Sequence, residues 1–329
     1  MKEKLLITGA SGFLGYHLIE AALLQDYEVY AGVRKSSSTG HLLNEDRVHV
    51  LQMDLSDLGS IKNTLEQHGI THIIHAAALT KAKTASAYNF SNAELTRNLA
   101  MAAAESSRGI QKFVFVSSLA ALGPALNGEP VKEDAVPRPL TWYGKSKLLA
   151  EQYLGEIPNL PFIGLRPTAV YGPREKDLLL LIKSVSRGLE VYIGKTEQQL
   201  SFVYVKDLAA LAVKCLHSKI IGEFYNIGDG NVYNRYAFAD AAKKATGRKT
   251  IRLQLPLALI ETIAGGMDAL YSRSSNTPVL NKEKLKELTA KDWSCSIIKS
   301  QKDLDFQPLY DLESGMAETV QWYKNNRWI

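Results

Sequence analysis

Residues 4–15 decide the fold: Lys4-Leu-Leu-Ile-Thr-Gly-Ala-Ser-Gly-Phe-Leu-Gly15. The apolar run over 4–8 is typical of a buried strand, and a helical pattern over about 12–24 begins inside the glycines. Glycine permits a tight turn, lets a phosphate approach the backbone, and lets a helix pack closely on a strand. Free N–H groups at a helix start also attract phosphate. The segment predicts a dinucleotide-binding turn, with a plain strand-to-helix turn as the alternative.

Strands and helices alternate in the residues that follow. The expected strands are 28–33, 48–53, 72–75, 112–116 and 162–166, and the expected helices are 89–107 and 143–154. Such alternation indicates parallel strands with crossover helices, and continuously apolar strands such as 112–116 indicate a sheet covered on both faces. We therefore expect an α/β fold with a Rossmann-type doubly wound parallel sheet of at least six strands.

The pattern becomes less regular after Gly172. The expected elements there are a helix over 178–187, strands near 191–193 and over 201–205, a helix over 206–217, a strand over 224–228, and a mostly helical tail from about 236. This predicts a nucleotide-binding domain over 1–172, to which 201–235 return. The rest, 173–200 and 236–329, is expected to form a smaller, mostly helical substrate-binding subdomain.

Composition narrows the class of protein. The chain has 329 residues, 46% of them hydrophobic and 22% charged, which excludes a disordered, collagen-like or small disulfide-bonded protein. A net charge of only +5, with interspersed charges, predicts no nucleic-acid partner. Cys215 and Cys295 lack a metal-ligand spacing, so we expect no metal site and a reducing, cytoplasmic environment. The first apolar run is too short for a signal peptide, and polar residues interrupt 253–270, so no integral membrane segment is expected.

The glycine spacing resembles that of a known family. Gly9, Gly12 and Gly15 follow the Gly-x-x-Gly-x-x-Gly pattern of extended short-chain dehydrogenases/reductases, which include sugar-nucleotide epimerases, dehydratases and 3β-hydroxysteroid-type dehydrogenases. The resemblance implies a nicotinamide cofactor, a small-molecule substrate and a possible homodimer formed through the helices of the active site. In this loop it implies cofactor contacts from Gly9, Ser11, Gly12, Phe13, Leu14 and Gly15.

The residues at the end of the second strand indicate whether the chain prefers NADP or NAD. Many NAD-using relatives have an acidic residue where this chain has Val33, and Arg34 and Lys35 follow at once. A guanidinium facing a 2′-phosphate forms a strong charge-assisted pair, so we expect NADP, with NAD possible and a solvated basic loop as the alternative. Asp54, followed by Leu55, matches the family position that contacts adenine, although a helix N-cap would also explain Asp54.

Tyr143 and Lys147 lie four residues apart, and therefore on one face of the expected helix. A neighbouring ammonium and a nicotinamide cation favour a phenolate, so we expect a lowered pKa for Tyr143. By resemblance, Tyr143 transfers the proton to or from the substrate oxygen and Lys147 binds the nicotinamide ribose.

Ser118 completes the expected catalytic set. The family pattern places the catalytic serine five residues before a glycine, which selects Ser118 through Gly123 and leaves Ser117 as the alternative. Its hydroxyl would polarise the substrate oxygen. Asn92 matches the asparagine that holds a relay water in the family, and a local helix hydrogen bond is the alternative.

Other segments also match the family. The resemblance implies further cofactor contacts from Ala76, Ala77, Ala78, Lys147, Pro167 and Val170. Glu151 continues the pattern of the active-site helix, and 202–207 resembles the segment before a late helix.

Two departures affect the predicted activity. Leu119-Ala120-Ala121 replaces the acidic pair of several dehydratases, which disfavours dehydration. Leu200 stands where many epimerases have a diphosphate-binding arginine, with Arg174 and Lys195 as candidate substitutes. The apolar segment 253–271 suggests either a substrate lid or simple packing, including packing in a dimer.

We therefore expect an NADP-dependent oxidoreductase that interconverts a secondary alcohol and a ketone. The alternatives are an NAD-dependent sugar-nucleotide epimerase with retained cofactor and a nucleotide-binding module without catalysis. Retention of Ser118, Tyr143 and Lys147 argues against the last.

Overall fold

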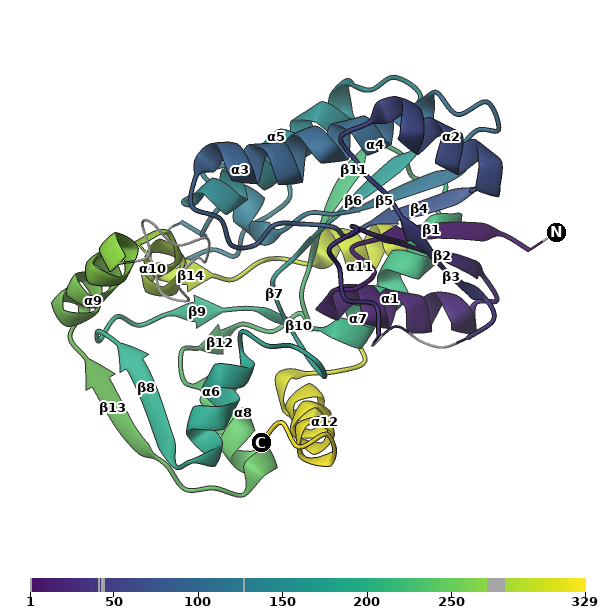
Figure 1. The fold of residues 1–329 in the computed structure, drawn as a ribbon. Helices are drawn as coiled ribbons and strands as arrows, with labels where there is room; N and C mark the ends of the chain where they lie inside the picture. Colours follow the sequence, from purple (N-terminus) through teal and green to yellow (C-terminus); the bar gives the residue numbers. More distant parts are fainter. Residues whose placement is uncertain (1, 41, 43–44, 127, 271–281) are drawn as a thin grey trace.

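A parallel sheet of seven strands forms the centre of the molecule (Figure 1). The computed structural model describes residues 2–40, 42, 45–126, 128–270 and 282–329. The strand order is β11-β6-β5-β4-β1-β2-β3. These strands are β1 (Lys4–Thr8), β2 (Glu28–Val33), β3 (Val48–Gln52), β4 (His72–His75), β5 (Lys112–Val116), β6 (Phe162–Pro167) and β11 (Glu223–Ile227). The α/β, doubly wound prediction is confirmed.

The strand order reverses beside β1. The chain builds β1, β2 and β3 outward on one side, and then crosses to β4, which pairs with β1 from the other side. Helices diverge at such a point and leave a crevice at the carboxyl ends of the strands, where nucleotides bind. The glycine turn after β1 lies at this point.

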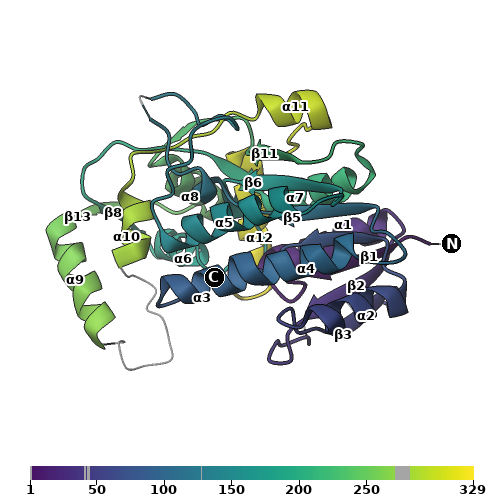
Figure 2. The same cartoon turned by 90° about the horizontal axis from the view of Figure 1, so that it is seen from above.

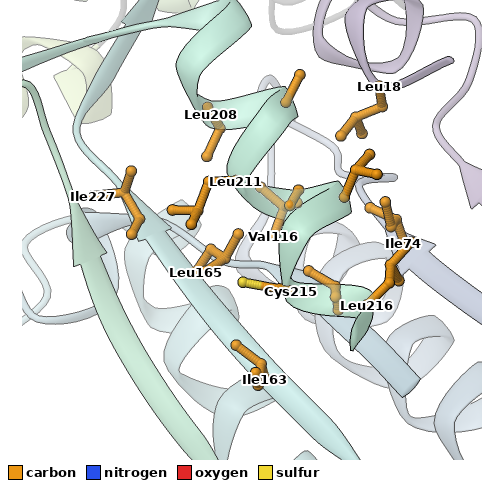
Figure 3. Close-up of a cluster of buried hydrophobic side chains, with 14 of the residues drawn as sticks. Leu18, Ile74, Val116, Ile163, Leu165, Leu208, Leu211, Cys215, Leu216 and Ile227 are labelled. Carbon is orange, nitrogen blue, oxygen red and sulfur yellow. The ribbon is translucent and has the colours of Figure 1, made fainter. Parts of the chain in front are cut away.

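Helices cover both faces of the sheet (Figures 1 and 2). On one face lie α1 (Phe13–Leu24) and α7 (Val205–Lys214), and on the other lie α2 (Leu58–His68), α4 (Leu95–Ala104) and α5 (Trp142–Glu156). Figure 3 shows the α1/α7 side, where Leu18, Leu208 and Leu211 pack with aliphatic side chains of the strands. Burial on both faces explains the continuously apolar strands.

The helix expected over about 89–107 is confirmed, although it begins and ends earlier in the chain and contains an irregular turn. The chain forms α3 (Ala85–Asn89), a π-helical turn (Phe90–Glu94) and then α4. The turn contains the fully buried Asn92, whose amide bonds to both backbone groups of Leu79. An inserted residue in a helix is often found at a functional site.

The residues beyond Gly172 contain both helices and small sheets. Helices α6 (Leu179–Ser186), α8 (Ala237–Thr246) and α12 (Leu312–Asn325) enclose a separate apolar cluster with Tyr171, Phe202 and Tyr204. The short strands are β7 (Ala169–Tyr171), β8 (Leu189–Ile193), β9 (Gln199–Leu200), β10 (Phe202–Tyr204), β12 (Tyr233–Asn234), β13 (Ile251–Leu255) and β14 (Asp292–Trp293), and the remaining helices are α9 (Leu257–Leu270), α10 (Lys282–Thr289) and α11 (Ile298–Leu304).

One part of the tail packs on the central sheet. Ile297, Leu304 and Phe306 belong to the same apolar cluster as the strands, and α11 contacts β11. The proposed division into a nucleotide-binding and a substrate-binding part therefore stays a prediction. Within the described residues, no helix has the length and apolar character needed to cross a bilayer.

Candidate active site

The glycine turn has the geometry that a pyrophosphate requires. Gly9 adopts φ +72°, and a Cβ on it would lie 2.7 Å from the Ala77 nitrogen. A Cβ on Gly15 would lie 2.2 Å from the Gly9 carbonyl oxygen, so α1 packs directly on the turn. Gly12 is the N-cap of α1 and, having no side chain, makes no capping hydrogen bond to the amide groups at the helix start. These residues fit a nucleotide phosphate.

A cavity of about 260 Å³ opens beside this turn. Of the residues predicted to contact the cofactor, its lining includes Gly9, Ser11, Gly12, Arg34, Asp54, Leu55, Ala76, Ala77 and Ala78. Phe13, Leu14, Gly15 and Lys35 lie outside the lining. The lining also includes Val33 and Ser37, which belong to the strand end considered for NADP against NAD. The lining residues that sequence reasoning missed are Thr8, Gly32, Met53, Leu79, Ser91 and Leu95. Most of them are sequence neighbours of predicted residues, and that proximity is the only feature of the sequence that could have indicated them.

The lining of this cavity includes a guanidinium, from Arg34, and a carboxylate, from Asp54. Val33 is buried, whereas Arg34 is exposed and forms no ion pair with any carboxylate of the described chain. The Asp54 carboxylate accepts hydrogen bonds from the Ser56 hydroxyl (2.7 Å) and nitrogen (2.9 Å), which lower the pKa of Asp54. The cap of α2 is Asp57, so the N-cap explanation of Asp54 is wrong.

A second cavity, of about 380 Å³, holds Ser118 and Tyr143. Its described lining is Thr80, Lys81, Tyr88, Ser118, Leu119, Ala120, Thr141, Tyr143, Pro167, Thr168, Ala169, Asp177, Leu200, Ser201, Phe202, Glu283, Lys284, Glu287 and Trp293. A Cβ on Gly144 would lie 2.3 Å from the Ala120 carbonyl oxygen, so the start of α5 presses on the turn that carries Ser118. Val170, predicted as a cofactor contact, lines neither cavity and pairs in β7 with Val203.

The structure separates the two candidate serines. Ser117 is buried and donates a 2.5 Å hydrogen bond to Glu151, which also binds Arg166 through both carboxylate oxygens (2.7 and 3.0 Å). Ser118 instead lines the cavity, and its oxygen accepts a hydrogen bond from the Ala120 nitrogen at 3.2 Å. Ser118 is therefore the serine that a molecule in the cavity can reach.

Lys147 lies one turn after Tyr143 but below the cavity. Its ammonium donates to the Val116 carbonyl oxygen at 2.8 Å and sits 4.8 Å from the centre of the Phe115 ring. Burial lowers the pKa of Lys147 to about 8, although the nearby Glu151 opposes the change. Lys147 thus anchors α5 to the end of β5.

We expected a lowered pKa for Tyr143. The side chains of the protein, without a bound cofactor, instead raise it. Burial raises the pKa of Tyr143, the Glu287 carboxylate raises it further, and interaction with Ser118 only partly opposes them. The Lys147 ammonium is directed to Val116 instead. Tyr143 is held as a neutral phenol, the form that donates a proton.

A buried polar chain connects the two parts of the site. His75 Nδ1 lies 2.6 Å from the Thr8 hydroxyl, and Nε2 lies 2.8 Å from the Thr96 hydroxyl. Thr96 donates to the Asn92 carbonyl oxygen (2.7 Å), so Nε2 carries the imidazole proton and Nδ1 accepts from Thr8. Burial lowers the pKa of His75 to about 3, with Lys147 adding to the effect. Sequence reasoning missed this role, although a histidine at each end of the apolar strand was a signal.

Asn92 lines neither cavity. Its amide nitrogen donates to the Leu79 carbonyl (3.0 Å) and the Ser146 hydroxyl (2.9 Å), and its amide oxygen accepts from the Leu79 nitrogen (2.7 Å). Ser146 in turn donates to the Tyr143 carbonyl. Asn92 therefore ties the loop between the two cavities to α5.

The tail closes the larger cavity with charged residues instead of an apolar lid. Glu283 accepts a hydrogen bond from the Trp142 nitrogen (2.9 Å), and Glu287 accepts one from the Thr141 hydroxyl (3.2 Å), so α10 docks on the start of α5. No described residue of 253–270 lines the cavity, and Tyr271 lies outside the described residues. The expected apolar substrate lid is therefore wrong for 253–270.

Nothing in the described lining replaces the missing arginine. Leu200 does line the cavity, but Arg174 stacks 3.6 Å from the Tyr16 ring centre and, like Lys195, contributes nothing to the lining. The lysines present lie beside carboxylates: Lys81 is 2.6 Å from Asp177, and Lys284 is 2.8 Å from Glu287. The described cavity offers no unpaired guanidinium for a diphosphate.

Comparison with known proteins agrees with this geometry. The model of the NAD dependent epimerase/dehydratase family matches residues 5–228. The chain is 30% identical to a ceramide reductase from Caulobacter vibrioides, over 98% of this chain and 95% of the relative. It is 27% identical to a UDP-glucose 4-epimerase from Vibrio cholerae, over 99% and 98%. The solved structure of gox2253 superposes with a TM-score of 0.79 and 25% identity, covering 99% of both chains. The chain therefore belongs to the NAD dependent epimerase/dehydratase family, and it is an NAD(P)-dependent enzyme of the extended short-chain dehydrogenase/reductase type.

Proposed function

We propose that the protein is an NADPH-dependent reductase that interconverts a ketone and a secondary alcohol on an uncharged, largely apolar small molecule. One observation carries this proposal. Ser118 and Tyr143 share a cavity whose described lining is rich in apolar side chains and contains no arginine. Such a cavity favours an apolar ligand held by a few polar groups around the reacting atoms.

The residues divide the work of ketone reduction among them. The bound cofactor supplies a hydride to the carbonyl carbon. Tyr143 donates its phenolic proton to the carbonyl oxygen, and the raised pKa keeps that proton in place until transfer. The hydroxyl of Ser118 donates a hydrogen bond to the same oxygen, because its own oxygen already accepts from Ala120.

Lys147 and Asn92 support this set. We assign the nicotinamide ribose to Lys147, whose ammonium donates to the Val116 carbonyl oxygen in the protein alone. Asn92 is a positioning residue, because its amide is committed to Leu79 and Ser146.

Arg34 supports NADPH over NADH. Its exposed guanidinium lines the smaller cavity next to Ser37, at a strand end where Val33 offers no carboxylate for ribose hydroxyls. A 2′-phosphate supplies the charge that the guanidinium lacks among the described residues.

The substrate class follows from charge. A sugar nucleotide carries a diphosphate, whereas the lysines of the larger cavity, Lys81 and Lys284, already pair with Asp177 and Glu287, and its described lining contains no arginine. The relative named as a ceramide reductase supports both a reductase and an apolar substrate, whereas the relative named as an epimerase keeps epimerisation as the alternative.

The test is net redox chemistry with the purified protein. We expect NADPH to bind more tightly than NADH by nicotinamide fluorescence, and apolar ketones to consume NADPH stoichiometrically. Tyr143→Phe is expected to lower the rate by about 10³-fold, within the range for a lost general acid. Tyr88→Phe is the matched control, because Tyr88 lines the same cavity but donates its hydroxyl to the Thr80 carbonyl. Co-purifying NAD, together with conversion of a UDP-sugar without net change in nicotinamide absorbance, would establish the epimerase instead.

A further inference from the structure

The β8–β13 ribbon carries its aliphatic side chains on the outside. The two strands pair in parallel, with Leu189 beside Ile251, Val191 beside Leu253 and Ile193 beside Leu255. Because side chains alternate along a strand, these six share one face of the ribbon. Ile251 is 70% exposed, Leu253 42% and Val191 38%.

The opposite face of the ribbon carries the polar residues. Glu190 is buried there and lies 2.9 Å from Lys243 of α8 and 3.2 Å from Arg252. The Tyr192 hydroxyl donates to the same carboxylate at 2.9 Å. The ribbon therefore buries one carboxylate, Glu190, beneath partly exposed cations on this face, whereas its other face turns aliphatic groups toward the surface.

Helix α9 extends this exposed surface. It begins two residues after β13, and Leu257, Leu259 and Ile263 are 39%, 48% and 44% exposed, while Ile260 is buried. The outward apolar face, as we name it, consists of the ribbon side chains Leu189, Val191, Ile193, Ile251, Leu253 and Leu255, together with Leu259 and Ile263, which lie four residues apart on one side of α9. Exposed apolar side chains gathered in this way mark an interaction site.

Positive charge flanks one end of this face. Arg187, Arg248 and Lys249 are exposed and make no ion pair with a carboxylate in the part of the chain that is described. They lie together, because the Ile251 nitrogen donates to the Gly188 carbonyl at 2.9 Å where the two strands begin. A basic rim beside an apolar face complements an anionic lipid surface.

The outward apolar face also lies next to the larger cavity. Helix α9 packs against α10, and α10 contributes Glu283 and Glu287 to the cavity lining (Figure 1). An apolar molecule leaving a bilayer at this face would reach the cavity by passing α10.

We propose that the outward apolar face docks on the surface of an anionic lipid bilayer, with Arg187, Arg248 and Lys249 on the headgroups and the aliphatic side chains in the interface. Docking places the larger cavity beside the membrane, so an apolar substrate is taken up without crossing water. This uptake rests on the proposed function, whereas docking itself does not.

Vesicle flotation of the full chain tests the proposal. We expect the protein to float with phosphatidylcholine vesicles containing phosphatidylglycerol, and less so as salt is raised. The variant R187Q/R248Q/K249Q is expected to bind about tenfold more weakly or worse, since each basic residue near an anionic surface contributes to binding. The aliphatic variant I251T/L259Q/I263T is expected to lose a similar share of binding. The control is L24Q/I298Q/L309Q, which removes side chains that are 85%, 70% and 83% exposed elsewhere.

Three results would overturn docking: no flotation of the wild type, an equal loss in the control variant, or ribbon variants that turn a dimer into a monomer while flotation stays the same. The last would assign the face to a second copy of the chain. NADPH consumption with a water-soluble ketone separates this proposal from the proposed function. The ribbon variants should leave that rate unchanged, and flotation without any ketone reduction would reject the reductase alone.

Discussion

The turn at 9–15 and the β8–β13 ribbon are both built around strands, but they are constrained in opposite ways. At the turn, backbone touches backbone, and a Cβ on Gly15 would lie 2.2 Å from the Gly9 oxygen. On the ribbon, Ile251 and Leu253 face outward. Residue identity at the turn is limited by space inside the molecule, whereas on the ribbon it is limited by what meets the surface. Substitutions should therefore be costly in the first region and cheap in the second.

The largest effect is expected from Gly15→Ala. The added methyl group must displace the turn, which should cost about 3 kcal/mol or more and abolish NADPH binding. Gly155→Ala in α5 is the matched control, because a Cβ there meets nothing within 4 Å. It should stabilise the protein by about 0.5–1 kcal/mol. Urea unfolding and a fluorescence titration measure both, and equal effects of the two substitutions would refute the spatial argument.

Substituting one buried carboxylate in each region allows the loss of folding stability to be compared directly. Glu151→Gln should cost about 3–5 kcal/mol, because it leaves the buried guanidinium of Arg166 without its charge partner. Glu190→Gln on the ribbon should cost about 1 kcal/mol, because the side chains of Lys243 and Arg252 are 26% and 40% exposed and water can take over.

Thermal unfolding followed by circular dichroism measures this difference. Glu156→Gln, at the exposed end of α5, is the control and should leave the melting temperature unchanged. If Glu190→Gln lowers the stability as much as Glu151→Gln does, the ion pairs of the ribbon are as important for stability as those of the active site.

A smaller effect is expected on cofactor choice. Arg34→Gln should weaken NADPH binding by about 10- to 100-fold, because it removes a charge-assisted hydrogen bond to the 2′-phosphate. NADH has no 2′-phosphate, so its binding should be unchanged. Lys35→Gln should change it less, because Lys35 lies outside the cavity lining. Dissociation constants for both nucleotides decide the matter, and an equal loss of NADH binding would point to a general effect on the fold.

The most gradual effect concerns pH. The pKa of His75 is lowered to about 3 from 6.5, so stability is complete above pH 6.5 and is lost as the pH falls toward 3. At pH 5.5 the loss should be about 1.4 kcal/mol. Burial raises the pKa of Glu190, but hydrogen bonds led by that from Thr250 prevail and hold it at about 2, so the ribbon should lose stability only below about pH 4.5.

The variant His75→Gln separates the two pH windows. It should flatten the unfolding curve between pH 6.5 and 5 while leaving the more acidic loss in place, which Glu190→Gln should remove instead. An unchanged slope in His75→Gln would show that another group titrates.

Local pattern predicted the sheet well, because β1, β2, β4 and β5 end where their apolar runs end. The family resemblance selected Ser118 and Tyr143, and the structure brings both to one cavity because a strand end and a helix start meet at one edge of a parallel sheet. The chain pattern did not predict the π-helical turn at Asn92, which depends on bonds to Leu79 thirteen residues earlier in sequence. Nor did it predict the direction of the Tyr143 pKa, because Glu287 reaches the cavity from α10, far along the chain.

The contacts that anchor α5 affect how readily an enzyme of this kind can change its substrate. Ser117 and Arg166, both from the central sheet, hold Glu151, and Val116 holds Lys147, so the position of Tyr143 is inherited mainly from strands laid down before residue 168. The later chain adds α10 to the lining of the cavity that holds this acid. Grafting a different carboxyl-terminal segment onto this scaffold should therefore change which molecules are turned over well before it destroys turnover, which makes the tail a natural target for directed evolution of new substrates.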